Sequence, residues 1–378
     1  MTEKKTNLKD LAKLFATLGI IGFGGPAAHI AMMRHEVVQK RAWMNDEHFL
    51  DLVGATNLIP GPNSTEMSMH IGQERGGWKG LVVAGLCFIL PAVCITVLFA
   101  WLYKQYGQLP QVQPFIYGIT PAIIAVILAA VYPLAKQSLK SIELVLLGIA
   151  AMVFALAGIN EIYVLFGAGL IALLLSALKS DSNNNKLNGI LPFSLLQIST
   201  ITLASITNAK LFFIFLKIGA ILYGSGYVLF AFLDAELVAT GILTRQQLID
   251  AIAVGQITPG PVFSSVTFIG YQLNGWSGAI VSTIGIFLPS FLFVALLNPL
   301  VKKLRTSKLF SSFLDAVNVA SVALITAICF EMGKETINDW RTVLIAALSI
   351  IVTFGFKKIN SAFIVLGGSV SGYLLTLI

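Results

Sequence analysis

Charged side chains are scarce in this sequence. Of its 378 residues, 25 are Lys or Arg and 18 are Asp or Glu, so charged residues make up 11% of the chain while hydrophobic residues make up 56%. A soluble domain carries roughly a quarter charged residues. Together with the mean hydropathy of +0.84, this composition excludes a soluble globular domain and predicts a protein of the lipid bilayer. The net charge of +7 is then expected to come from basic loops rather than from a nucleic-acid-binding surface.

Cysteines and complete catalytic or metal-binding sets are also scarce. The three cysteines, Cys87, Cys94 and Cys329, lie in apolar stretches, which suits small buried side chains better than disulfides or metal thiolates. No nucleophile cluster, acid pair or metal-ligand motif is complete, so we expect neither an enzyme nor a bound metal or cofactor. The polar start, MTEKKTNLKD, lacks an apolar core with a cleavage site, so we expect no removable signal peptide.

Long apolar runs are what the sequence has in abundance. One crossing of the ~30 Å hydrocarbon core takes about 20 helical residues, and the alternating pattern of barrel strands is absent. The expected fold class is therefore all-α, a polytopic helical membrane protein. Twelve apolar runs fall at residues 11–33, 49–72, 80–103, 113–135, 142–158, 162–178, 211–233, 247–271, 277–299, 311–330, 342–355 and 359–378.

One polar stretch at the midpoint divides these runs. It reads KSDSNNNKLNG, from Lys179 to Gly189, and we interpret it as a linker. This gives an N-terminal repeat at 1–179, a linker at 180–209 and a C-terminal repeat at 210–378. The uncharged run 187–209 is long enough for a further crossing, for about 12 to 13 membrane segments in all.

The two halves share a pattern of glycine, proline and tryptophan. FLDLVGATNLIPGP, ending at Pro62, corresponds to LIDAIAVGQITPGP, ending at Pro261. Shared order of such residues predicts an internal duplication. Further on, Gly72, Gly77, Trp78, Gly80 and Pro91 align with Gly270, Gly275, Trp276, Gly278 and Pro289.

The distribution of basic residues predicts that the two halves are inverted. Lys and Arg collect in cytoplasmic loops. If each run crosses once, the side that carries the N-terminus holds nine basic residues against four in the first half, whereas the side on which the second half begins holds three against seven. The bias reverses, so we expect inverted halves with the N-terminus inside.

The two PGP triplets interrupt apolar segments and predict broken helices. Proline removes a backbone donor and glycine tolerates unusual dihedrals. A broken helix exposes free N–H groups and the positive end of a half-helix dipole, which favour an anion. A simple kink is the alternative, but the duplication favours a transport site at the midplane. The expected donors are Gly61, Asn63, Ser64 and Thr65 in one half and Gly260, Ser264 and Ser265 in the other.

A glycine-rich segment and two basic residues extend this candidate site. Gly24 and Gly25 lack the lysine of a phosphate loop, so we interpret them as a second helix break or a close helix contact. Lys217 lies inside an apolar run, where a partner anion or a water-filled cavity is needed. We expect it to attract the substrate, with snorkelling to the membrane surface as the alternative. Arg34 follows the glycine-rich segment, either to attract an anion or as a loop residue of the positive-inside bias.

Glu66 and His70 are the remaining candidates. Glu66 follows the first PGP triplet, and His70 lies one helical turn later on the same face. Glu66 is expected to couple transport to protons or to pair with a cation such as Arg34 or Lys217. A metal site shared by His70 and His29 is a weaker alternative, because no ligand motif is complete.

These motifs resemble those of a known family. FGGPAAHIAMMRHEVV from Phe23, IPGPNSTEMSMHIG, GQITPGPVFSSVTFIGY and GIFLPSF are similar to segments of the chromate ion transporter (CHR) family, and the resemblance covers nearly the whole chain. Many members resemble PGPxSSQ where this chain has PGPNSTE, so Glu66 stands in place of a glutamine. An acid beside a dianion site repels it unless the acid is protonated or paired.

The resemblance implies a two-domain secondary transporter of the bacterial inner membrane that exports chromate. Sulfate or another small oxyanion, an organic acid and a passive anion channel stay open as alternatives. The expected partners are a small inorganic oxyanion, the lipid bilayer and a second copy of the chain in a homodimer, with no nucleic acid.

Overall fold

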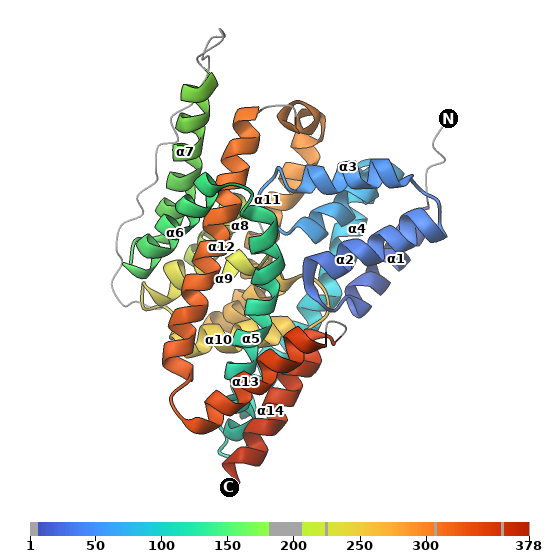
Figure 1. The fold of residues 1–378 in the computed structure, drawn as a ribbon. Helices are drawn as coiled ribbons and strands as arrows, with labels where there is room; N and C mark the ends of the chain where they lie inside the picture. Colours follow the sequence, from blue (N-terminus) through green and yellow to red (C-terminus); the bar gives the residue numbers. More distant parts are fainter. Residues whose placement is uncertain (1–6, 181–205, 224–225, 306–307, 357–358, 378) are drawn as a thin grey trace.

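The computed structural model describes residues 7–180, 206–223, 226–305, 308–356 and 359–377 as helices and short connections, with no β-strand in these ranges (Figure 1). The predicted all-α fold is therefore confirmed. Four helical stretches are long and apolar enough to cross a membrane: Asn63–Tyr106, Gln113–Ser138, Val262–Leu296 and Leu309–Thr336. The chain is a multi-pass membrane protein. Most of the predicted linker, including most of the further crossing proposed at 187–209, lies outside the described residues.

The same order of elements occurs twice. The first set is α1 (Leu8–Ile21), α2 (Gly25–Arg34), the π-helix η1 (His35–Lys40), α3 (Asp46–Thr56), α4 (Asn63–Tyr106), α5 (Gln113–Ser138), α6 (Ile142–Leu156) and α7 (Glu161–Ser180). The second set is α8 (Asn208–Ile221), η2 (Gly226–Val228), α9 (Leu229–Leu233), the π-helix η3 (Asp234–Val238), α10 (Arg245–Ile257), η4 (Val262–Ser264), α11 (Ser265–Arg305), α12 (Lys308–Thr336), α13 (Trp340–Gly355) and α14 (Ser361–Thr376).

Helices α4 and α11 each double back at a glycine. Gly77 and Gly275 have φ of 59° and 61°, a left-handed conformation that glycine adopts without a Cβ clash. On either side of the first turn, Gly72 and Gly80 pack backbone against backbone, and a Cβ on either would collide with the other's carbonyl. Gly270 and Gly278 repeat this contact at the second turn. The glycines shared by the two halves are therefore needed for tight helical hairpins.

Two apolar runs of the first repeat return to the face from which they start. Leu8 and Leu11 of α1 lie beside Gly76 and Gly80 at the first hairpin turn. His48, near the start of α3, bonds Glu74 just before that turn at 2.7 Å, and Arg34 at the end of α2 bonds Asp46. Runs 11–33 and 49–72 are therefore re-entrant, and the assumption that each apolar run crosses once is wrong for them. Hydropathy indicates that a segment lies in the lipid bilayer. It does not show whether a broken helix continues across the bilayer or turns back.

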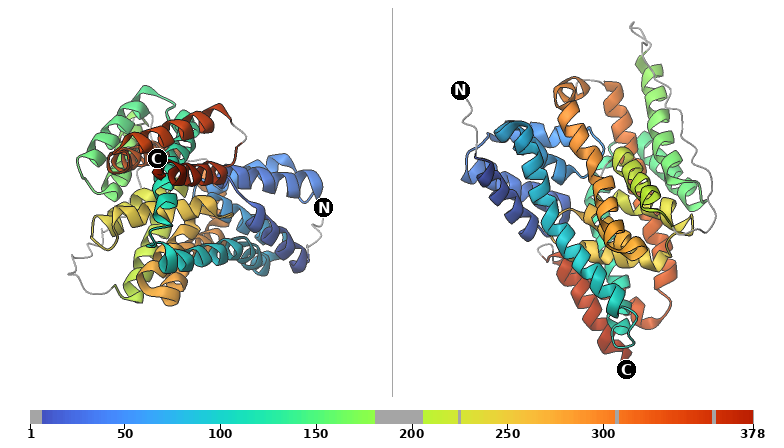
Figure 2. Two further views of the ribbon diagram at one scale, coloured as in Figure 1. Left: turned by 90° about the horizontal axis from the view of Figure 1, so that it is seen from below. Right: turned by 180° about the vertical axis from the view of Figure 1, so that it is seen from behind.

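The two repeats are inverted relative to each other. After the Gly77 turn, α4 continues for about 40 Å at 1.5 Å per residue, to a point where Lys104 stacks on Tyr271. Tyr271 lies just before the Gly275 turn, where Asn274 also bonds Asn208 at the start of α8. The start of α1 and the start of α8 thus lie on opposite faces, called here the N-terminal face and the opposite face. Helices α4 and α11 pack against each other through the middle of the molecule (Figure 2).

Candidate functional site

The two PGP turns are held by a reciprocal pair of hydrogen bonds between the repeats. The Gly61 amide donates to the carbonyl of Leu222, at the end of α8, at 2.8 Å, and the Gly260 amide donates to the carbonyl of Gly22, at the end of α1, at 2.7 Å. Gly61 and Gly260 have φ of 135° and 89°, which only glycine adopts readily. The predicted helix breaks are confirmed, and the ends of α1 and α8 meet at them.

Two of the predicted anion donors are therefore engaged elsewhere. The amides of Gly61 and Gly260 were expected to face an anion, but in this structure each binds a carbonyl of the other repeat. The amides at a helix break stay free only if no other segment of the chain ends beside them. The sequence of one repeat does not show that a helix end of the other repeat lies there. The amides of Gly61 and Gly260 are not free to bind an anion in this structure.

A cavity of about 680 Å³ reaches one of the two breaks from the N-terminal face. We call it the vestibule. Its walls are α2 and α3 on one side and the end of α5, the start and middle of α12 and η2 on the other. Lys140 and Asp315 form an ion pair of 2.7 Å on its wall. Its polar lining consists of Asn57, Asn63, Gln137, Ser138, Lys140, Ser311, Asp315, Asn318 and Ser321.

The vestibule exposes the N-terminal ends of two helices. Pro26 and Ala27, in the first turn of α2, and Asn63, the first residue of α4, contribute to its lining. Neither helix has a side-chain cap on its first amides. Uncapped amides and the aligned helix dipole together favour a bound anion. The vestibule therefore offers positive potential without an unpaired cation.

The first-repeat candidates differ in their access to the vestibule. Asn63 lines it, with its amide nitrogen bonded to Oδ1 of Asn57 at 2.6 Å. Ser64 and Thr65 are buried one layer behind, and the Thr65 hydroxyl has no hydrogen-bond partner among the described residues. Gly24 and Gly25 have φ of 101° and 77° and immediately precede Pro26 at the lining.

His29 is a site residue that the sequence analysis considered only as a weak metal ligand. It is 1% exposed, its Nε2 lies 2.9 Å from the carbonyl of Gly22, and its Nδ1 lies 3.2 Å from the hydroxyl of Ser64. Because a carbonyl only accepts, Nε2 carries the proton and Nδ1 accepts from Ser64. Both ring nitrogens are thus used to join the α1 break to the α4 N-terminus, which leaves none for a metal.

Glu66 is completely buried between the repeats. Its side chain is 0% exposed, and neither carboxylate oxygen has a hydrogen-bond partner among the described residues. Its Oε1 and the hydroxyl of Ser290, from α11, both lie against the Cα of Gly61, at the place where a Cβ would stand. His70, one turn further along α4, is 1% exposed, and both its ring nitrogens also lack partners in the described structure.

Neither basic candidate pairs with Glu66. Arg34 makes a two-pronged contact with Asp46 at 2.8 and 2.9 Å, with 44% of its side chain exposed, and this contact holds the pKa of Asp46 below its usual value. Lys217 pairs with Glu236 at 2.6 Å. The expectation of a partner anion for Lys217 is met by Glu236, and the alternative that Arg34 or Lys217 neutralises Glu66 is wrong. Pairing across elements depends on tertiary structure that sequence spacing does not reveal.

The second-repeat candidates lie away from the vestibule. Ser264 accepts a hydrogen bond from Thr96 of α4 at 3.2 Å, and Ser265 donates to the carbonyl of Val262 at 2.9 Å. Both serines are 0% exposed. Of the candidates that follow the two PGP triplets, Asn63 thus lines the open cavity, whereas Thr65 and the serines of both repeats are buried.

Comparison with known proteins gives full-length matches. A chromate transport protein of Cupriavidus metallidurans is 31% identical over 373 residues, which cover 97% of this chain and 92% of the relative. A probable chromate transport protein of Synechococcus elongatus is 29% identical, with 97% and 95% covered. A chromate transport protein of Pseudomonas aeruginosa is 26% identical, with 96% and 91% covered. No solved structure matches the chain.

A family model matches each repeat separately. The model described as chromate transporter covers residues 9–173 and again residues 209–373, which is the duplication seen in the order of the helices. The relatives above are named as transport proteins. With two inverted repeats, two helix breaks that meet between them and a matching model over most of its length, the chain belongs to the chromate transporter family.

Proposed function

We propose that this protein exports chromate across the bacterial inner membrane by alternating access, with its N-terminal face toward the cytoplasm. The observation that carries the proposal is the vestibule, which leads from that face to two uncapped helix N-termini beside a PGP break. The names of the full-length relatives support chromate as the substrate. Sulfate and other tetrahedral oxyanions have similar size and charge, so we expect them to compete.

The anion is held mainly by helix ends. Asn63, the backbone amides of Gly24, Gly25 and Ala27, and the hydroxyl of Thr65 supply the donors when the N-terminal face is open. Pro26 has no N–H group, and the hydroxyl of Ser64 already donates to His29. Gly260, Ser264 and Ser265 belong to the equivalent position of the second repeat and serve the other state of the cycle. Gly61 joins the repeats, and Arg34 and Lys217, which are already paired, do not contact the anion directly.

Glu66 couples this movement to a proton. A carboxylate buried without a partner is stable only when it carries a proton or meets a cation. Glu66 also lies against Gly61 and faces the hydroxyl of Ser290, and these two residues belong to different repeats. Gain or loss of its proton therefore changes the contact between the repeats, and His70 supplies a second group on the same helix face.

Reconstituted protein tests the proposal. Uptake of chromate into proteoliposomes is measured with sulfate or molybdate as competitor, and with an imposed pH gradient but no chromate gradient. We expect saturable uptake, competition by sulfate and accumulation against the concentration gradient. Uptake that never exceeds the equilibrium concentration would favour a passive channel. Transport of sulfate but not of chromate would show that sulfate is the substrate.

A further inference from the structure

We infer that the opposite face holds a second vestibule, which is closed in this structure and forms the exit path of the anion. It is lined by the residues of each repeat that are equivalent to those lining the open vestibule in the other repeat. The inference rests on the proposed function, because it takes the two repeats to exchange conformations during transport. What it adds is the set of residues that line the second path and the contact that keeps it closed.

The internal alignment identifies the lining. Aligning the PGP triplets pairs Gly54 and Asn57, which line the vestibule, with Ala253 and Gln256. Aligning α5 with α12 through their shared FxxxxxxAxxA pattern, from Phe115 and Phe313, pairs Asn318 with Thr120. The same positions of the fold therefore recur on the opposite face.

The aligned residues are packed instead of open. Ala253, Gln256 and Thr120 are 4%, 6% and 5% exposed, whereas Asn57 is exposed and Gly54 and Asn318 are partly exposed. Helix α10 packs against α5, and α9 packs against α12. On the N-terminal face, the corresponding elements α3, α2, α5 and α12 are separated by the vestibule.

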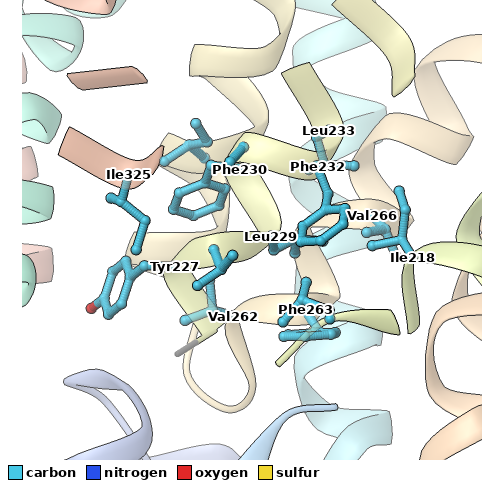
Figure 3. Close-up of a cluster of buried hydrophobic side chains, with 14 of the residues drawn as sticks. Ile218, Tyr227, Leu229, Phe230, Phe232, Leu233, Val262, Phe263, Val266 and Ile325 are labelled. Atoms are coloured by element: carbon cyan, nitrogen blue, oxygen red, sulfur yellow. The ribbon is translucent and has the colours of Figure 1, made fainter. Parts of the chain in front are cut away.

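Apolar side chains fill the closed path. Leu229, Phe230 and Val262 belong to one cluster of buried residues. Figure 3 shows them beside one another, with Ile325 of α12, which also lines the open vestibule, near Phe230. Phe230 and Val262 align with Ile30 and Asn63 of the open vestibule. The closed path is a dry contact between helix faces, which opens when α9 and α10 move away from α5 and α12.

One polar side chain in the closed path is almost completely buried. Gln256 is 94% buried, and its side-chain amide faces the hydroxyl of Tyr227. Its counterpart Asn57 faces the open vestibule. Gln256 is therefore a buried polar group that water or the anion reaches when the path opens.

An ion-pair latch closes the path. Arg245, at the start of α10, contacts Asp234 of η3 at 3.4 Å and Glu335 at the end of α12 at 3.2 Å. On the N-terminal face, the aligned position Asp46 pairs with Arg34, and the position aligned with Glu335 is the uncharged Gln137, which lines the vestibule. The latch is thus specific to the closed face, and opening must break the contact between Arg245 and Glu335.

Cysteine labelling tests the inference without relying on transport. In a chain with Cys87, Cys94 and Cys329 replaced by Ala, single cysteines are introduced as Gly54→Cys, Ala253→Cys and, as a control, Ala251→Cys. Ala251 is on α10, 0% exposed, and its aligned position Leu52 does not line the vestibule. A membrane-impermeant maleimide is applied to right-side-out and to everted vesicles. We expect Gly54→Cys to react from the N-terminal face and Ala253→Cys to be protected.

Removing the latch should open the second path. Glu335→Gln, which keeps the pair of Arg245 with Asp234, should raise labelling of Ala253→Cys from the opposite face by about fivefold, as expected for loss of one partly exposed ion pair. Labelling of Gly54→Cys should fall. The adjacent Lys334→Gln, whose side chain pairs with Glu331, is the matched control and should change neither.

The outcomes separate this inference from the proposed function. Unchanged labelling of Ala253→Cys in Glu335→Gln and during chromate transport would overturn the second vestibule while leaving chromate transport in place. Labelling of Ala251→Cys to the same extent would indicate general loosening and would also overturn it. If the protein moves no chromate but Glu335→Gln still increases labelling of Ala253→Cys from the opposite face, chromate is not the substrate and the second vestibule is supported.

Discussion

The amide of Gly61 lies 2.8 Å from the carbonyl of Leu222, and this one contact joins the turn of the first repeat to a helix end of the second. Its counterpart, between Gly260 and Gly22, does the same in the other direction. The center of the protein is therefore a crossed pair of loops, each supported by the other repeat. Glu66, His29 and Ser64 are placed around this cross and not around a single helix break.

Replacing Gly61 should test how strongly the cross depends on glycine. Gly61→Ala places a Cβ against Glu66 and Ser290 and forces an L-residue to φ 135°. Strain of this kind costs about 1–3 kcal/mol, so the thermal unfolding temperature in detergent should fall and transport should be lost. Gly167→Ala, at a position in α7 with nothing within 4 Å, should behave as the original protein. Equal unfolding temperatures for the two variants would contradict the tight packing at Gly61.

A negative charge at Asn63 should separate folding from anion binding. Asn63→Asp puts a carboxylate at the first residue of α4, where the helix dipole stabilises it, so the protein should remain folded. The same charge repels a dianion in the vestibule, and KM for chromate should rise at least about tenfold, or 1.4 kcal/mol. Asn63→Ser keeps a polar, neutral side chain and should change KM much less. A similar KM for both variants would place the anion elsewhere.

The pair of Lys217 and Glu236 should prove structural. Lys217→Ala leaves the carboxylate of Glu236, 15% exposed, without its partner and should lower stability and transport together. Adding Glu236→Ala should restore both, because no unpaired charge remains. If the double variant is stable but still fails to transport chromate, Lys217 interacts with the anion directly. Arg34→Ala, at a pair that is about half exposed, should alter transport by less than about twofold.

Glu66 should determine the response to a proton gradient. Glu66→Gln keeps the size and polarity of the side chain but cannot exchange a proton. We expect it to move chromate down its concentration gradient at a rate that no longer depends on pH, and to lose accumulation driven by a pH gradient in proteoliposomes. The control is Glu47→Gln on the exposed start of α3, which should keep both properties. Gradient-driven accumulation by Glu66→Gln would exclude Glu66 as the coupling group.

Local chemistry explains which features the sequence predicts. The breaks at Pro60–Pro62 and Pro259–Pro261 follow from the missing donor of proline and the dihedral freedom of glycine, so they need no knowledge of the fold. The duplication is visible because residues with such fixed roles recur in one order. The glycines at 77 and 275 were recognised as matched positions, although their role in hairpin turns required the structure.

Features that depend on tertiary contacts could not be predicted in this way. The re-entrant path of α1 and α2 places Arg34 beside Asp46, and no hydropathy pattern distinguishes a chain that crosses from one that turns back. The pairing of Lys217 with Glu236 joins two elements separated by a helix break. The vestibule, likewise, is lined by α2, α3, α5 and α12, so single-residue candidates such as Asn63 were found while their neighbours Asn57 and Asn318 were not assigned to the site.

The crossed amide bonds make each repeat an incomplete half. Gly61 has its acceptor only in the other copy, and so has Gly260. One repeat produced alone would leave the glycine amide of its PGP turn and the carbonyl at its helix end without hydrogen-bond partners. It would have to associate with a second repeat in the inverted orientation before its central loops could fold. Fusion of the two copies in a single polypeptide therefore guarantees an equal supply of both halves and ties maturation of the first to synthesis of the second.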